Sequence, residues 1–67
     1  MDAEPTIRLD QFMKLVGWVR SGGEAKHVIQ EGQVSLNGEV ETRRSKQLRA
    51  GDRVAFAGRE AVVELSR

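Results

Sequence analysis

The spacing of the apolar residues changes at Gly32, and this change limits the possible folds more than any other feature of the chain. Before Gly32 the apolar residues recur every three or four positions, as in a helix with one buried face. After Gly32 they alternate with polar neighbours, as in a half-buried strand. We therefore predict an α+β fold, in which a helical hairpin is followed by a small antiparallel β-sheet.

Two helices are predicted in the first half of the chain. The first has apolar residues at i, i+3, i+4 and i+7, namely Leu9, Phe12, Met13 and Val16, and Gly17 is typical of its end. The second begins after Ser21 with a capping box, in which Glu24 reaches back to the amide of the cap serine. It ends near Gly32, and its apolar face holds Ala25, Val28 and Ile29. Residues 6–8 are too few to decide whether a short strand precedes the hairpin.

The strands are predicted from alternation and turn residues. Val34 and Leu36 lead into Asn37-Gly38, the dipeptide best suited to a type I′ hairpin turn because both central residues need a positive φ. Further strands are expected over 53–57 and 60–65, separated by a turn at Gly58-Arg59. The predicted core shared by hairpin and sheet is Leu9, Phe12, Met13, Val16, Ala25, Val28, Ile29, Val34, Leu36, Val54, Phe56 and Val62.

The composition narrows the class of protein. A chain of 67 residues forms one domain, 1–67, with a core over about 6–65, and its 39% apolar and 31% charged residues indicate a globular fold. The absence of cysteine and the single histidine argue against a disulfide framework and a metal site, and we expect no cofactor. No apolar run approaches the length of a membrane helix, and the acidic N-terminus is unlike a signal peptide. We expect a cytoplasmic monomer.

The net charge of +1 conceals a locally basic stretch. Arg43, Arg44 and Lys46 follow the first hairpin in a segment too polar for a buried strand, so we predict a loop that binds phosphates. The second helix has a polar face opposite its apolar one, made of Gly23, Lys26, His27 and Gln30. Its first amides, at Gly22 and Gly23, are open to an anion. The alternative is that both the loop and the face are merely solvated.

Two side chains have a structural and a functional interpretation. Trp18 more often closes a small core than stacks on a base, and a lone histidine such as His27 is usually solvated.

No nucleophile with a nearby base, acid–base pair or metal cluster is apparent, and Asp10 and Glu24 are better explained as acids that complement a helix dipole. We therefore predict a binding protein that is not an enzyme.

These residues resemble the RNA-binding domain of ribosomal small-subunit protein four, the S-four domain. The similarity covers Ile7-Arg8-Leu9-Asp10, residues 21–44 and residues 48–54. It implies an L-shaped RNA-binding motif, the alpha-L motif, and bacterial members of this length that consist of this domain alone are associated with ribosomal RNA. It further implies that Ser21, Gly22, Lys26 and Gln30 face RNA, while Asn37 and Gly38 shape the neighbouring turn. Many members have arginine where this chain has Gly22, so only a backbone contact is expected there.

The predicted function is therefore recognition of structured RNA, ribosomal or tRNA-like, through the second helix and the basic loop, with the ribosome as a further candidate partner. A β-grasp sulfur carrier is nearly excluded because the chain ends Leu65-Ser66-Arg67 and not in Gly-Gly. An adaptor that uses the same basic surface to bind acidic proteins stays open. The sequence also does not decide whether the role is ribosome assembly, translation or the rescue of stalled complexes, or whether Arg8 or Trp18 touches RNA.

Overall fold

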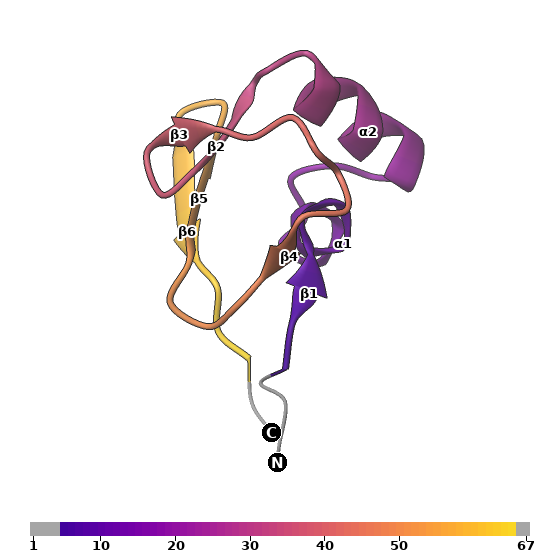
Figure 1. The fold of residues 1–67 in the computed structure, drawn as a ribbon. Helices are drawn as coiled ribbons and strands as arrows, with labels where there is room; N and C mark the ends of the chain where they lie inside the picture. The colour runs from indigo at the N-terminus through magenta and orange to yellow at the C-terminus, as the bar shows by residue number, and fades with distance from the viewer. Residues whose placement is uncertain (1–4, 66–67) are drawn as a thin grey trace.

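Two helices lie beside a four-stranded antiparallel sheet in the computed structural model, which describes residues 5–65 (Figure 1). This arrangement confirms the predicted α+β fold. A second, two-stranded sheet lies near the first helix. The elements in chain order are β1 (Ile7–Arg8), α1 (Leu9–Leu15), α2 (Gly22–Gln30), β2 (Val34–Leu36), β3 (Glu39–Val40), β4 (Gln47–Leu48), β5 (Arg53–Phe56) and β6 (Arg59–Val62).

Both helices end in the same hydrogen-bonded motif, which explains the two glycine stops. At the end of α1, the Gly17 amide donates to the Lys14 carbonyl and the Trp18 amide to the Met13 carbonyl. This is the Schellman arrangement, and it needs a left-handed residue, here Gly17 with a φ of 81°. At the end of α2, Gly32 has a φ of 78° and the corresponding two bonds form.

The start of α2 confirms the predicted cap and corrects one of its contacts. The Ser21 hydroxyl accepts a hydrogen bond from the Glu24 amide over 3.1 Å, as an N-cap serine should. The Glu24 carboxylate does not return to the Ser21 amide. Its Oε1 accepts from the Arg20 amide over 2.7 Å, one residue further back, so the reciprocal half of the predicted capping box is wrong.

The larger sheet has the strand order β3-β2-β5-β6 with antiparallel neighbours throughout. Asn37 and Gly38 connect β2 to β3 with φ values of 52° and 88°, which confirms the predicted hairpin turn. The turn between β5 and β6 is made by Ala57 and Gly58, both with positive φ, and Arg59 already belongs to β6. The prediction of a Gly58-Arg59 turn was therefore wrong by one residue.

The hydrophobic core lies between the helical hairpin and the larger sheet, and its residues differ in part from those predicted. Val16 and Val62 are exposed, by 38% and 46%, so their assignment to the core was wrong. Val16 is already the C-cap of α1, beyond the helical repeat, and Val62 faces outward because its neighbour Val63 is the buried one. The buried hydrophobic residues are Leu9, Phe12, Met13, Val19, Ala25, Ile29, Val34, Leu48, Val54 and Val63.

A short strand pair ties the start of the chain to the segment after the basic loop. Ile7 pairs with Leu48 and Arg8 with Gln47, so residues 7 and 8 do form a strand. The sequence did not predict β4, because two residues between charged neighbours show no alternation. Leu48 is nevertheless fully buried, and the pairing fixes where the basic stretch ends relative to α1.

Candidate nucleic-acid interface

The basic loop, residues 41–46, is held against the first turn of α1 by its own backbone. The N-cap residue Arg8 makes no side-chain cap hydrogen bond, so the first amides of α1 need other acceptors. The Leu9 amide donates to the Lys46 carbonyl over 2.9 Å and the Asp10 amide to the Arg44 carbonyl over 3.1 Å. The loop therefore caps α1, and its charged side chains are presented from a fixed backbone.

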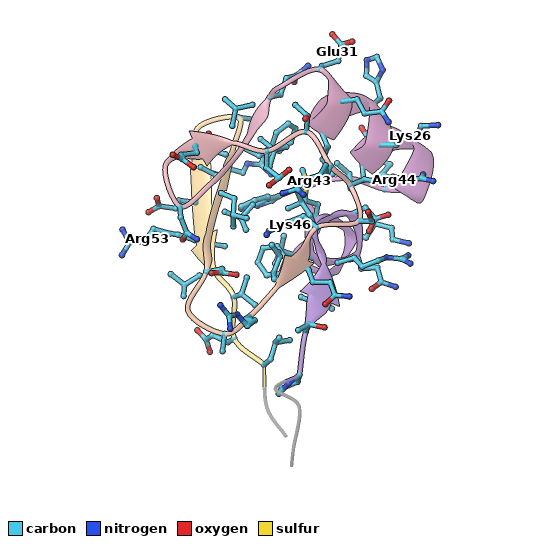
Figure 2. All side chains as sticks on the ribbon, viewed as in Figure 1. Lys26, Glu31, Arg43, Arg44, Lys46 and Arg53 are labelled. Carbon is cyan, nitrogen blue, oxygen red and sulfur yellow. The ribbon has the colours of Figure 1, made fainter. Side chains whose placement is uncertain are left out.

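Arg44 and Lys26 point to the same side of the molecule, although 18 positions separate them in the chain (Figure 2). Arg44 leaves the loop toward α2, and Lys26 leaves the exposed side of α2. Both side chains are exposed, as are those of Gln30 and His27. We call Lys26, His27, Gln30 and Arg44 the α2–loop face. It brings together the polar side of the second helix and one cation of the loop.

Arg43 and Lys46 lie on the other side of the loop. Arg43 is paired with Glu41, since its Nε donates to Glu41 Oε2 over 3.1 Å and its backbone amide donates to the same oxygen over 3.1 Å. These hydrogen bonds hold the pKa of Glu41 below its ordinary value, and the positive charge of Lys46 lowers it further. The three predicted loop cations are thus divided between two surfaces, and Arg43 is ion-paired with Glu41 in the free protein.

The first residues of α2 leave their backbone open to solvent. A Cβ atom added at Gly22 would meet nothing within 4 Å, and one added at Gly23 would meet only the Ser21 hydroxyl at 3.8 Å. A partner can therefore approach the amides of this turn closely. The carboxylate of Glu24 is turned back to Arg20, so its charge stays beside the same turn.

Asn37 and Gly38 form the tip of the β2–β3 hairpin. The Asn37 side chain accepts from the Arg53 amide over 2.9 Å and donates to Asp52 Oδ1 over 3.2 Å. Asp52 in turn accepts from the Arg49 amide over 2.8 Å, which is the main reason why its pKa is lowered. The side chain of Asn37 thus fixes the turn to the 49–53 segment.

A polar hollow of about 370 Å³ opens between the β2–β3 hairpin and the segment from the basic loop to Asp52. The sequence alone does not predict it, because its walls combine the β2–β3 hairpin with the separate segment from the basic loop to Asp52. The only signal in the sequence was the mixture of acidic and basic residues within 39–53. The residues that line it are Leu36, Asn37, Glu39, Val40, Glu41, Arg43, Lys46, Gln47, Arg49 and Asp52.

Other predicted features have a structural explanation. Trp18 packs edge-to-face on Phe12, with ring centroids 6.2 Å apart, and its ring centroid lies 6.3 Å from that of Phe56, so it closes the core. Within residues 5–65 no cluster of three or more His, Cys, Asp or Glu side chains could hold a metal ion. No helix of the same range is long and apolar enough to cross a membrane.

Comparison with known proteins assigns the family. Residues 2–64 match the model of the S4 domain, so this chain belongs to the S4 domain family. Among curated proteins it is 46% identical over 59 residues to YbcJ of Escherichia coli, a match that covers 88% of this chain and 84% of that protein. It is 42% identical over 52 residues to the probable ribosome maturation protein RlbA of Bacillus subtilis, covering 78% and 73% of the two chains.

Solved structures give the same fold. The solution structure of YbcJ from Escherichia coli, which reveals an alpha-L motif involved in RNA-binding, has a TM-score of 0.66 at 42% identity and covers 92% of this chain and 78% of that one. Heat shock protein 15 of Vibrio cholerae matches with a TM-score of 0.79 at 18% identity, over 94% of this chain and 67% of that one. The fold predicted from the resemblance, an alpha-L motif, is therefore confirmed.

Proposed function

We propose that this protein is a non-catalytic module that binds structured RNA, with ribosomal RNA as its target, through the α2–loop face. The family and the RNA-binding motif of YbcJ support binding to RNA, and the ribosome maturation name of RlbA supports the ribosomal choice. The observation that carries the proposal is the backbone capping of α1 by the basic loop. It holds Arg44 on the same side as Lys26 and the open start of α2.

The α2–loop face suits a phosphate backbone. Lysine and arginine neutralise phosphates and release condensed counterions, which supplies most of the sequence-independent affinity for nucleic acid. The open amides of Gly22 and Gly23 add donors that reach a phosphate oxygen without a side chain between. Gln30 and His27 are exposed on α2 and add side-chain hydrogen-bonding groups to the charge of the α2–loop face.

The test is a fluorescence anisotropy titration with a labelled hairpin of ribosomal RNA. Lys26→Ala and Arg44→Ala should each weaken binding and flatten the plot of log affinity against log salt by somewhat less than one unit, about 0.7 to 0.9 per lost phosphate contact. Arg53→Ala is the matched control, because Arg53 is exposed and points away from this face in Figure 2. It should leave both quantities nearly unchanged.

Crosslinking in cells, followed by sequencing of the bound RNA, then tests the ribosomal target. Enrichment of ribosomal RNA that is lost in Lys26→Ala/Arg44→Ala supports it. If Lys26→Ala, Arg44→Ala and the double variant all bind RNA as well as the wild type, the α2–loop face is not the interface. If partners co-purify equally well after ribonuclease treatment, the protein is an adaptor for acidic proteins. Sedimentation equilibrium tests the expected monomer separately.

A further inference from the structure

We propose that the polar hollow beside β3 receives one unpaired nucleotide of the bound RNA, so that the domain reads a bulge or loop and not only the shape of a duplex. This proposal rests on the proposed function and names the kind of RNA that the function would select. The hollow of about 370 Å³ falls within the size range of small-molecule sites, roughly 300 to 1,000 Å³.

The position of the hollow matches the path of an RNA strand. Lys46 belongs to the basic loop and also lines the hollow, while Arg44, two residues earlier, belongs to the α2–loop face. Arg43 and Lys46 line the hollow, whereas Figure 2 shows Arg44 turned toward α2. A backbone that follows the loop from Arg44 to Lys46 would therefore bring its next nucleotide to the mouth of the hollow.

The charges of the hollow suit a base better than a second phosphate. Three cations, Arg43, Lys46 and Arg49, stand against three carboxylates, Glu39, Glu41 and Asp52. The attraction for an anion is therefore balanced, and hydrogen bonding decides what binds. The carboxylates of Glu41 and Asp52 are already held by Arg43 and by the Arg49 amide.

The free hydrogen-bonding groups indicate which base is preferred. Within residues 5–65, Glu39 and Gln47 have no side-chain hydrogen bond, and both are exposed at the lining of the hollow. A carboxylate accepts from an exocyclic amine, and an amide pairs with the adenine edge. Uracil has no exocyclic amine, so adenine and cytosine should be preferred to it. The exposed side chain of Val40, 63% accessible, supplies an apolar surface for the ring.

The test compares an RNA hairpin that carries one bulged adenosine with the same hairpin without the bulge and with one that carries a bulged uridine. The wild type should bind the adenosine bulge about tenfold more tightly than the other two, which is within the discrimination that one bidentate base contact provides. The ratio of affinities is the readout, because a change in overall charge alters all three affinities alike.

Glu39→Ala and Gln47→Ala should reduce that ratio toward one. Glu60→Ala is the matched control for Glu39→Ala, since it removes the same charge from an exposed strand position that does not line the hollow. A preserved ratio in Glu60→Ala and a lost ratio in the two hollow variants supports the proposal.

Three results would overturn it. Equal binding of the three hairpins by the wild type removes the nucleotide site and leaves the proposed RNA-binding function standing. No binding of any hairpin removes both. If adenosine monophosphate alone shifts the NMR signals of Glu39 and Gln47 while the hairpins bind equally, the hollow takes a free nucleotide and not one from the bound RNA.

Discussion

The side chain of Asn37 joins the tip of the β2–β3 hairpin to Asp52, because its Nδ2 donates to Asp52 Oδ1 over 3.2 Å while its Oδ1 accepts from the Arg53 amide over 2.9 Å. Its backbone is left-handed, with a φ of 52°. Asparagine tolerates this conformation better than other residues with a Cβ atom. One residue thus fits the turn and fastens it to the neighbouring segment.

Replacing Asn37 should therefore destabilise the domain although the residue is exposed. In Asn37→Ala both hydrogen bonds are lost and an alanine is forced to a positive φ, so we expect a loss of about 2 kcal/mol in the free energy of unfolding. Urea denaturation measures it. Thr6→Ala, at another exposed polar position, is the control and should change stability by less than about 0.5 kcal/mol. Equal midpoints for the two variants would contradict the role of Asn37.

The second hairpin contains the opposite situation, since Ala57 has a φ of 53° and is followed by Gly58. Alanine is strained in this region, whereas Asn-Gly is the preferred sequence for such a turn. Ala57→Asn should therefore stabilise the protein by roughly 1 kcal/mol, seen as a higher midpoint in thermal unfolding. Ala50 is exposed and has no positive φ, so Ala50→Asn serves as the control and should give no gain in stability.

The sequence predicted the parts of the fold that depend on local rules. Asn37-Gly38, the Ser21 cap and the Gly17 and Gly32 stops are each set by the conformation of one or two residues, and each formed as expected. The register of β6 is different, because Ala61, Val62 and Val63 are all apolar and alternation does not choose between them. The Ala57-Gly58 turn and a long-range hydrogen bond from the Val63 amide to the Asp52 carbonyl choose the register.

The site residues show the same limit. The sequence predicts that Lys26, Arg43, Arg44 and Lys46 are exposed cations. The structure exposes the first three and half-buries Lys46. It does not reveal which side of the loop each cation takes. The side that each cation takes depends on the hydrogen bonds between the loop and the first turn of α1, and on the pairing of Arg43 with Glu41. These contacts form only in the folded chain, so the order of the residues does not reveal them.

The register of β6 can be tested with two neighbouring valines. Val63 is 1% exposed and Val62 is 46% exposed, so Val63→Ala should lower the free energy of unfolding by about 2 kcal/mol and Val62→Ala by less than about 0.5 kcal/mol. The two variants make the same chemical change at adjacent positions, so each is the control for the other. Chemical denaturation that ranks them in the reverse order would show that the strand is shifted by one residue.

Acid should weaken the fold partly through Asp52. The hydrogen bond from the Arg49 amide holds the pKa of Asp52 below its ordinary value of 3.8. A carboxyl group with a lowered pKa in the folded state stabilises that state above its unfolded pKa, and the contribution is lost as the pH falls through the folded value. We expect the unfolding free energy of Asp52→Asn to fall less than that of the wild type as the pH is lowered from 5 toward 3. Parallel pH profiles would exclude this contribution.

The pairing of Arg43 with Glu41 predicts a variant that binds RNA more tightly than the wild type. The Arg43 side chain is 69% exposed and that of Glu41 is 12% exposed, so RNA can reach the arginine, but the Glu41 carboxylate is already paired with it. In Glu41→Gln the charge becomes available to a phosphate. Binding of the ribosomal RNA hairpin should then strengthen at low salt, and the plot of log affinity against log salt should become steeper by up to about 0.9 units. Glu60→Gln removes a carboxylate of β6 and should leave the slope close to that of the wild type. An unchanged slope in Glu41→Gln would show that Arg43 does not contact phosphate even when it is released from its partner.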